Sequence, residues 1–297
     1  MSAIRESGDA SEQPIQVLVS LHNQMSLLDL AGPLEVLSRA CHNISDPESK
    51  AFDITLAAEE QHVMTAAGVS IQAQTSLAEV NKRLHEFDVL IVPGGHVLEI
   101  LGDEDEDEPL DTIKAFAELQ AGDPSRERTL LAIDTAALFL AKLGLLQGLG
   151  ATTHPDYYIK MEKLCQAAAA RDTQERTDVM EERYVVNHGR FDVDVEGDDI
   201  VDNPYVFRKG TGPRKGSNAR KGSVARKESN ARHESTIRRA AMRLGGLRVI
   251  TTGGPASGLD AALYLVSAVV SLESAQEVSR VMQYTWVKGV VVDAIDV

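Results

Sequence analysis

Short, continuously apolar runs that alternate with helical patterns constrain the fold of this chain most strongly. Runs of strand length lie at 15–20, 52–57, 87–92, 129–133 and 247–252, and residues with helical apolar spacing follow them. Strands that are apolar at successive positions are buried on both faces, as in parallel sheets whose crossover helices cover them. We therefore predict an α/β fold in which helices sandwich a mainly parallel sheet.

The run at 130–133 passes directly into Asp134, which precedes an Ala/Leu-rich helical pattern at 135–143. A strand that turns sharply into a helix holds one side chain at the carboxyl edge of the sheet, above the free N–H groups of the helix start. Many α/β enzymes place a nucleophile there, and this chain places a carboxylate. The alternative is that Asp134 only caps the helix, because Asp is a preferred N-cap residue.

Other chemistry-bearing residues also follow predicted strands. Asp29 lies between the first strand and a helix predicted from about Pro33, and the third strand runs into a tight Pro-Gly-Gly turn that contains Gly94 and Gly95. A strand at 151–153 ends in His154, and a strand pair is predicted at 183–187 and 190–195. Open α/β sheets bind ligands at the carboxyl ends of their strands, so these residues are candidates for one site.

Charge and composition narrow the class of protein. The formal net charge of −15 argues against nucleic-acid binding by the body of the protein. No apolar run reaches the length of a membrane span, and the first residues lack the apolar core of a signal peptide, so we expect a cytoplasmic protein without a membrane partner. The two cysteines, Cys41 and Cys165, form no metal spacing, and no phosphate or dinucleotide motif is present. We therefore expect no metal and no cofactor.

A basic, low-complexity segment interrupts this pattern at 199–245. Its tandem hexads carry Arg-x-x-Ser units, and residues 208–239 hold 11 Lys/Arg against 2 acidic residues. With few large apolar residues, the segment is predicted to be a disordered insertion in a single α/β domain at 14–198 and 246–297, after a disordered N-terminus at 1–13. It is either a tolerated repeat expansion or a dock for a kinase or an acidic partner. The candidate phosphorylation sites are Ser217, Ser223, Ser229 and Ser235.

Five strings, in this order, resemble the PfpI/ThiJ superfamily. They are LLDLAGPLEVL, FDVLIVPGG, the strand-turn-helix followed by GLLQGLGATTH, ITTGGPASGLDAALYLV and EVSRVMQYTW. The resemblance spans about 14–198 and 246–288 and implies a flavodoxin-like fold of the class I glutamine-amidotransferase type. Within the superfamily, the chain is most similar to the isonitrile hydratase branch.

The resemblance implies roles for particular residues. The nucleophile position falls on Asp134, where the family usually has a cysteine, and the activating acid falls on Asp29. The oxyanion donors fall on the backbone of Gly95, beside Gly94, and of Thr135, and a threonine after the elbow matches isonitrile hydratases. Further carry-overs place Asp260 in the pocket wall and His154 where it orients substrate, and imply a homodimer.

Two hypotheses follow from these residues. Two carboxyls in one partly desolvated pocket would have separated pKa values and form an acid/base dyad. The first hypothesis is therefore a small-molecule hydratase or lyase of the isonitrile hydratase type, with Asp134 and Asp29 as the dyad. The second is a catalytically dead relative that senses a ligand or acts as a phosphoregulated interaction protein.

Overall fold

The structure of the protein is a computed structural model that describes residues 13–102, 109–123, 126–172, 176–188 and 247–292. Several predicted features lie outside the described residues. They are the N-terminal segment before residue 13, the acidic run at 103–108, the strand at 190–195, and the insertion at 199–245 with Ser217, Ser223, Ser229 and Ser235.

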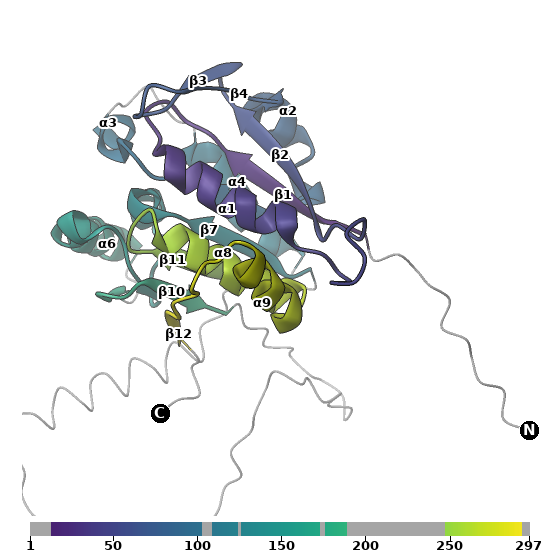
Figure 1. Ribbon diagram of the computed structural model, residues 1–297. Coiled ribbons are helices and arrows are strands. Elements are labelled where there is room, and N and C mark those ends of the chain that lie inside the picture. The colour runs from purple at the N-terminus through teal and green to yellow at the C-terminus, as the bar shows by residue number, and fades with distance from the viewer. Residues whose placement is uncertain (1–12, 103–108, 124–125, 173–175, 189–246, 293–297) are drawn as a thin grey trace, which may run out of the picture.

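An eight-stranded sheet forms the centre of the described part of the chain (Figure 1). From one edge to the other its strands are β12 (Val290–Val292), β10 (Tyr184–Asn187), β11 (Leu247–Thr252), β7 (Arg128–Ala132), β6 (Val89–Val92), β1 (Ile15–Ser20), β2 (Phe52–Ala58) and β5 (Thr75–Ser76). Every neighbouring pair is parallel except β10 and β11. The predicted mainly parallel sheet is therefore confirmed.

The five central strands have the order of a flavodoxin-like fold. Across the sheet they run β2, β1, β6, β7, β11, which is the order 2-1-3-4-5 along the chain. Strands β6 and β7 are buried at every residue, which explains why β6 is entirely apolar and why β7 is apolar from Leu130 to Ala132. The strand order reverses between β1 and β6, and such a switch point opens a crevice at the carboxyl ends of the strands. A site is therefore expected beside the ends of β1, β6 and β7.

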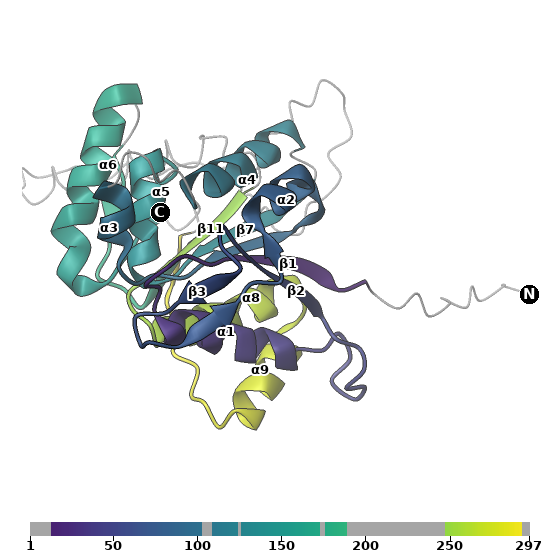
Figure 2. The ribbon, with the colours of Figure 1, turned by 90° about the horizontal axis from the view of Figure 1, so that it is seen from above.

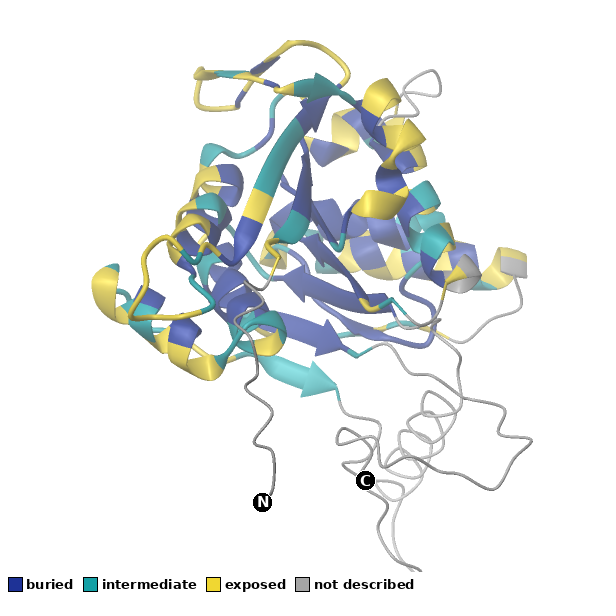
Figure 3. Ribbon diagram, turned by 90° about the vertical axis from the view of Figure 1, so that its right-hand side faces the viewer, coloured by how far each residue is buried: buried dark blue, intermediate teal, exposed yellow. Residues whose placement is uncertain are grey.

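Helices cover both faces of the sheet (Figure 2). One face packs against α2 (Leu77–Lys82), α3 (Val97–Gly102), α4 (Leu110–Gly122), α5 (Ala137–Leu143) and α6 (Tyr158–Asp172). The other face packs against α1 (Leu27–Arg39), α8 (Ser257–Val269) and α9 (Leu272–Val281). Buried residues line the sheet while exposed residues lie on the outer sides of the helices (Figure 3). None of the helices in the described ranges is both long and apolar enough to cross a membrane.

Helix α1 begins six residues before the predicted start. Its N-cap is Ser26, and Pro33 lies inside the helix rather than in its first turn. Proline lacks the N–H that would bond the carbonyl of Asp29, but the buried apolar face of α1 outweighs the loss of one hydrogen bond. The prediction that Asp29 precedes the helix was wrong: Asp29 lies in the first helical turn.

Two short elements also differ from the prediction. The strand predicted at 151–153 is β8 (Gly150–Ala151), which pairs with β9 (Asp178–Val179) outside the main sheet. The side chain of Asn187 donates to the carbonyl oxygen of Gly150 at 2.7 Å and accepts from its N–H at 3.1 Å. A second small sheet pairs β3 (His62–Met64) with β4 (Ser70–Gln72). In consequence, His154 follows β8 on a short connection instead of ending a strand of the main sheet.

Candidate functional site

The turn after β7 is the most constrained backbone of the site. Asp134 has a φ of 59°, a left-handed conformation that is uncommon for a non-glycine residue. It begins a short 3-10 turn that leads into α5, whose N-cap residue is Ala136 and has no side-chain capping bond. Asp134 therefore does not cap α5. Its carboxyl is instead held in a sharp turn between strand and helix, the geometry of a nucleophile elbow.

Asp29 reaches the same edge of the sheet from the first turn of α1. Its Oδ2 accepts the N–H of Gly94 at 3.0 Å, and the carboxyl is completely buried. Ser26 is the N-cap residue of α1, and its side chain partly opposes the rise that burial causes in the pKa of this carboxyl. The start of α1 therefore fixes Asp29 against the Pro-Gly-Gly turn that follows β6.

The two carboxyls share an environment that disfavours charge. Burial raises the pKa of Asp29 to about 7, and repulsion from Asp134 is the second cause. Burial also raises the pKa of Asp134 to about 6. In each carboxyl, Oδ1 is buried and has no hydrogen-bond partner among the described residues. The pair therefore holds a proton near neutral pH, with Asp29 as the more readily protonated member.

The Pro-Gly-Gly turn meets the elbow in close contact. The N–H of Gly95 donates to Thr135 Oγ1 at 2.8 Å, and the Thr135 hydroxyl donates to the Gly95 carbonyl oxygen at 3.0 Å. Gly95 has a φ of 129°, where side chains are strongly disfavoured. The N–H groups of Gly94 and Gly95 are thus both engaged inside the protein. A substrate oxyanion would have to displace the Thr135 hydroxyl to reach the N–H of Gly95.

His154 lies at the rim of this site. Its Nδ1 accepts the N–H of Asp156 at 3.3 Å, and its side chain is about one third exposed. Burial raises the pKa of the Asp29 carboxyl, and electrostatic attraction to His154 is the smallest of the effects that oppose this rise. Asp134 itself is 6% exposed.

Asp260 makes a different set of contacts. Its carboxylate forms an ion pair with the Arg183 guanidinium, accepts the Tyr284 hydroxyl at 3.1 Å, and accepts the Val287 N–H at 2.8 Å. The group is completely buried and both oxygens are bonded. Asp260 therefore links α8 to Arg183, which precedes β10, and to Tyr284 and Val287, which follow α9. Both carboxylate oxygens have hydrogen-bond partners.

Substitution of Asp260 by asparagine is expected to lower the free energy of unfolding by about 2 kcal/mol, because the side chain keeps an acceptor for Val287 but loses its pairing with Arg183. Urea unfolding at pH 7 measures the change. Glu35→Gln is the matched control, since Glu35 pairs with Arg39 on the exposed side of α1 and should contribute less than about 1 kcal/mol. Equal effects of the two substitutions would contradict this account of Asp260.

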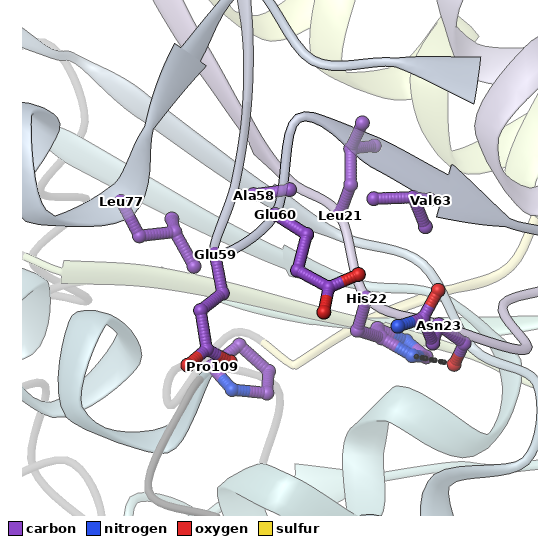
Figure 4. Close-up of a pocket in the computed structure, with 9 residues that line it drawn as sticks. All are labelled: Leu21, His22, Asn23, Ala58, Glu59, Glu60, Val63, Leu77 and Pro109. Carbon is purple, nitrogen blue, oxygen red and sulfur yellow. Dashed lines mark hydrogen bonds between the residues drawn. The ribbon is translucent and has the colours of Figure 1, made fainter.

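His22, which follows β1, also contacts the Pro-Gly-Gly turn. Its Nε2 lies 2.9 Å from the carbonyl oxygen of Pro93, and its ring packs edge-on against Phe139. Burial lowers the pKa of His22 and favours the neutral ring. The same imidazole lines a separate cavity of about 80 Å³, toward which Glu59 and Glu60 extend (Figure 4). His22 could not be singled out from the sequence, because a single histidine after a strand has no distinguishing pattern.

The part of the chain that the structure describes contains no preformed set of metal ligands. No group of three or more His, Cys, Asp or Glu side chains is placed there to hold an ion. Cys165 is buried, and burial raises the pKa of its thiol, which disfavours the reactive thiolate. The elbow region itself presents the carboxyls of Asp134 and Asp29.

A flavodoxin-like sheet with a sharp strand-to-helix elbow at its carboxyl edge defines a class of α/β proteins with a site at this edge. A scan of family models matches residues 15–191 to the DJ-1/PfpI family. The chain belongs to the DJ-1/PfpI family.

Solved structures support the same fold. DJ-1beta of Drosophila melanogaster is 17% identical with a TM-score of 0.51, over 92% of this chain and all of that one. A ThiJ/PfpI family protein of Pseudomonas syringae is 16% identical with a TM-score of 0.53, over 95% and 82% of the two chains. An AraC family transcriptional regulator of Pseudomonas putida is 15% identical with a TM-score of 0.52, over 91% and 100%. A search of curated proteins found no match.

Proposed function

We propose that this protein hydrates isonitriles to N-substituted formamides, with Asp29 and Asp134 as an acid/base dyad. The observation that carries the proposal is the pair of buried carboxyls at the elbow, each with a raised pKa and with one oxygen that has no hydrogen-bond partner among the described residues. Carboxyls whose pKa values lie near neutral pH suit proton transfer, since one can donate while the other accepts.

The dyad balances the reaction without a further reactant. The protonated carboxyl donates its proton to the terminal carbon of the isonitrile, and the ionised carboxyl takes a proton from water as the water oxygen attacks that carbon. The resulting imidic acid tautomerises to the formamide, and the dyad again holds one proton. A carboxylate is a weaker nucleophile than a thiolate, so acid/base roles suit Asp134 better than covalent attack. His154 would orient the substrate, together with the N–H of Gly95 once the substrate has displaced the Thr135 hydroxyl.

Turnover of alkyl and aryl isonitriles tests the proposal, with formamide measured between pH 4 and 9. Wild type is expected to give a bell-shaped profile centred between the two pKa values, near 6 and near 7. Asp134→Asn is expected to lose at least about 100-fold in rate, because asparagine cannot exchange the proton. Asp111→Asn, an exposed carboxyl in the first turn of α4, is the control and should keep the wild-type rate. Absence of turnover by wild type across a broad isonitrile panel would overturn the proposal.

A second candidate function is ligand sensing without catalysis. The observation that favours it is that the N–H of Gly95, a candidate oxyanion donor, already donates a hydrogen bond to Thr135 Oγ1. Such a protein would bind isonitriles or small carbonyl compounds, and ligand would raise its melting temperature without product formation. Deletion of residues 208–239 would then abolish binding of a kinase or an acidic partner while the domain stays folded.

The proposed assembly is a cytoplasmic homodimer, by analogy with the family.

A further inference from the structure

Two threonines from other segments hold the backbone of the elbow residue. The N–H of Asp134 donates to Thr252 Oγ1 at 2.9 Å, and the Thr153 hydroxyl donates to the carbonyl oxygen of Asp134 at 3.0 Å. Thr252 ends β11, and Thr153 lies two residues after β8. Both threonines are completely buried.

These bonds act on the backbone conformation that sets the direction of the carboxyl. Asp134 has a φ of 59°, a left-handed value that belongs neither to a β-strand nor to a right-handed helix. The two hydroxyls bond both the N–H and the carbonyl of this residue. Threonine is suited to this role because its branched Cβ restricts χ1 and keeps the hydroxyl in place.

We propose that Thr252 and Thr153 are positioning residues that clamp the main chain of Asp134 so that its carboxyl faces Asp29. The catalytic consequence rests on the proposed function, whereas the clamp itself rests on the two hydrogen bonds to the main chain of Asp134. Loss of the Thr252 hydroxyl leaves a buried N–H without an acceptor, and the elbow relaxes from its left-handed conformation. The Asp134 carboxyl then moves away from Asp29, and the repulsion between the two carboxyls falls.

Thr251 provides a matched control one residue earlier on the same strand. It is also completely buried, and its Oγ1 accepts a backbone N–H at 2.9 Å, but the donor is Thr152 rather than the elbow residue. Thr251→Val and Thr252→Val therefore remove the same kind of bond from neighbouring positions. Thr252→Ser keeps the hydroxyl, and Thr153→Val removes the second bond of the clamp.

The test is a titration of the full chain, carbon-13 labelled at aspartate carboxyls, followed by NMR between pH 3 and 9. Thr252→Val and Thr153→Val are expected to lower the upper apparent pKa of the dyad by about one unit, since the repulsion that raises the pKa of Asp29 weakens. Thr251→Val and Thr252→Ser should titrate like wild type. An unchanged dyad titration in Thr153→Val or in a folded Thr252→Val, or an equal change in Thr251→Val, would overturn the clamp.

Isonitrile turnover by the same variants separates the two proposals. If wild type is active, the Thr252→Val rate is expected to fall about tenfold while Thr251→Val keeps the wild-type rate. If wild type is inactive, the proposed hydratase function fails, and the titration still decides whether the clamp exists.

Discussion

Asp29→Asn is expected to make the protein more stable at pH 8 while it removes the proposed activity. The pKa of Asp29 rises from 3.8 in the unfolded chain to about 7 in the folded protein, chiefly through burial. The folded state therefore binds this proton more tightly, which favours folding at low pH, and the advantage is lost as the pH rises from about 4 through 7. At pH 8 the buried carboxylate costs the folded state about 4 kcal/mol. Asparagine carries no charge and avoids that cost.

Urea unfolding of wild type and Asp29→Asn at pH 5 and pH 8 measures the effect. The variant is expected to gain up to about 4 kcal/mol at pH 8 and much less at pH 5, where the wild-type carboxyl is protonated. Asp156→Asn is the control, because its carboxyl is 83% exposed and should change stability little at either pH. A variant that is no more stable than wild type at pH 8, or a gain that does not depend on pH, would contradict the raised pKa. Formamide production by the variant should fall at least about 100-fold.

Two completely buried aspartates in this domain differ in how their charge is compensated. Asp260 has an arginine, a tyrosine hydroxyl and a backbone N–H on its two oxygens. The contacts of Asp29 include the Gly94 N–H, while its Oδ1 has no hydrogen-bond partner within the described ranges. Natural proteins accept such uncompensated groups mainly at functional sites, where a perturbed pKa serves chemistry. The contrast separates a carboxylate that stabilises the fold from one whose retention needs a functional reason.

The sheet was predictable because its central strands are apolar at successive positions. Strands β6 and β7 are buried on both faces, so β6 is entirely apolar and β7 is apolar after Arg128 and Thr129. The start of α1 was not predictable from the same rules, because Pro33 is usually read as a first-turn residue and here lies in the second turn. Only the packing of the buried face of α1 decides between the two positions.

The sequence indicated the two carboxyl groups of the candidate site but not the residues that form hydrogen bonds around the site. Asp134 lies just after β7, and Asp29 lies in the first turn of the helix that follows β1, so the order of the strands predicts that both lie at one edge of the sheet. The hydrogen bond from Asp134 to Thr252 joins residues 118 positions apart, and the ion pair of Arg183 with Asp260 joins residues 77 apart. Hydroxyls in apolar strands have no periodic pattern, and the positive φ of Asp134 falls on a residue that is not glycine. Contacts between residues so far apart in the sequence can be identified only once the fold and the pairing of the strands are known.

Gly94→Ala is expected to disrupt the dyad and to destabilise the protein by about 3 kcal/mol. A Cβ on Gly94 would lie 2.7 Å from the Ile133 carbonyl oxygen, 2.8 Å from Asp29 Oδ2 and 2.8 Å from the Thr135 nitrogen. Two of these atoms are backbone of the elbow, and the third is the carboxyl that accepts the Gly94 N–H. The turn must therefore move away from both elements at once, which breaks the bond from Gly94 to Asp29.

Gly102→Ala is the matched control for this substitution, because a Cβ there meets no atom of the described residues within 4 Å and the residue ends α3. Urea unfolding of the two variants at pH 6 compares the cost of the same added methyl group. Gly102→Ala should stay within about 1 kcal/mol of wild type. If Gly94→Ala matched that small change and kept the dyad titration of wild type, the turn would be able to withdraw from the elbow without loss. In that case the close packing at Gly94 would not be what holds Asp29 beside Asp134.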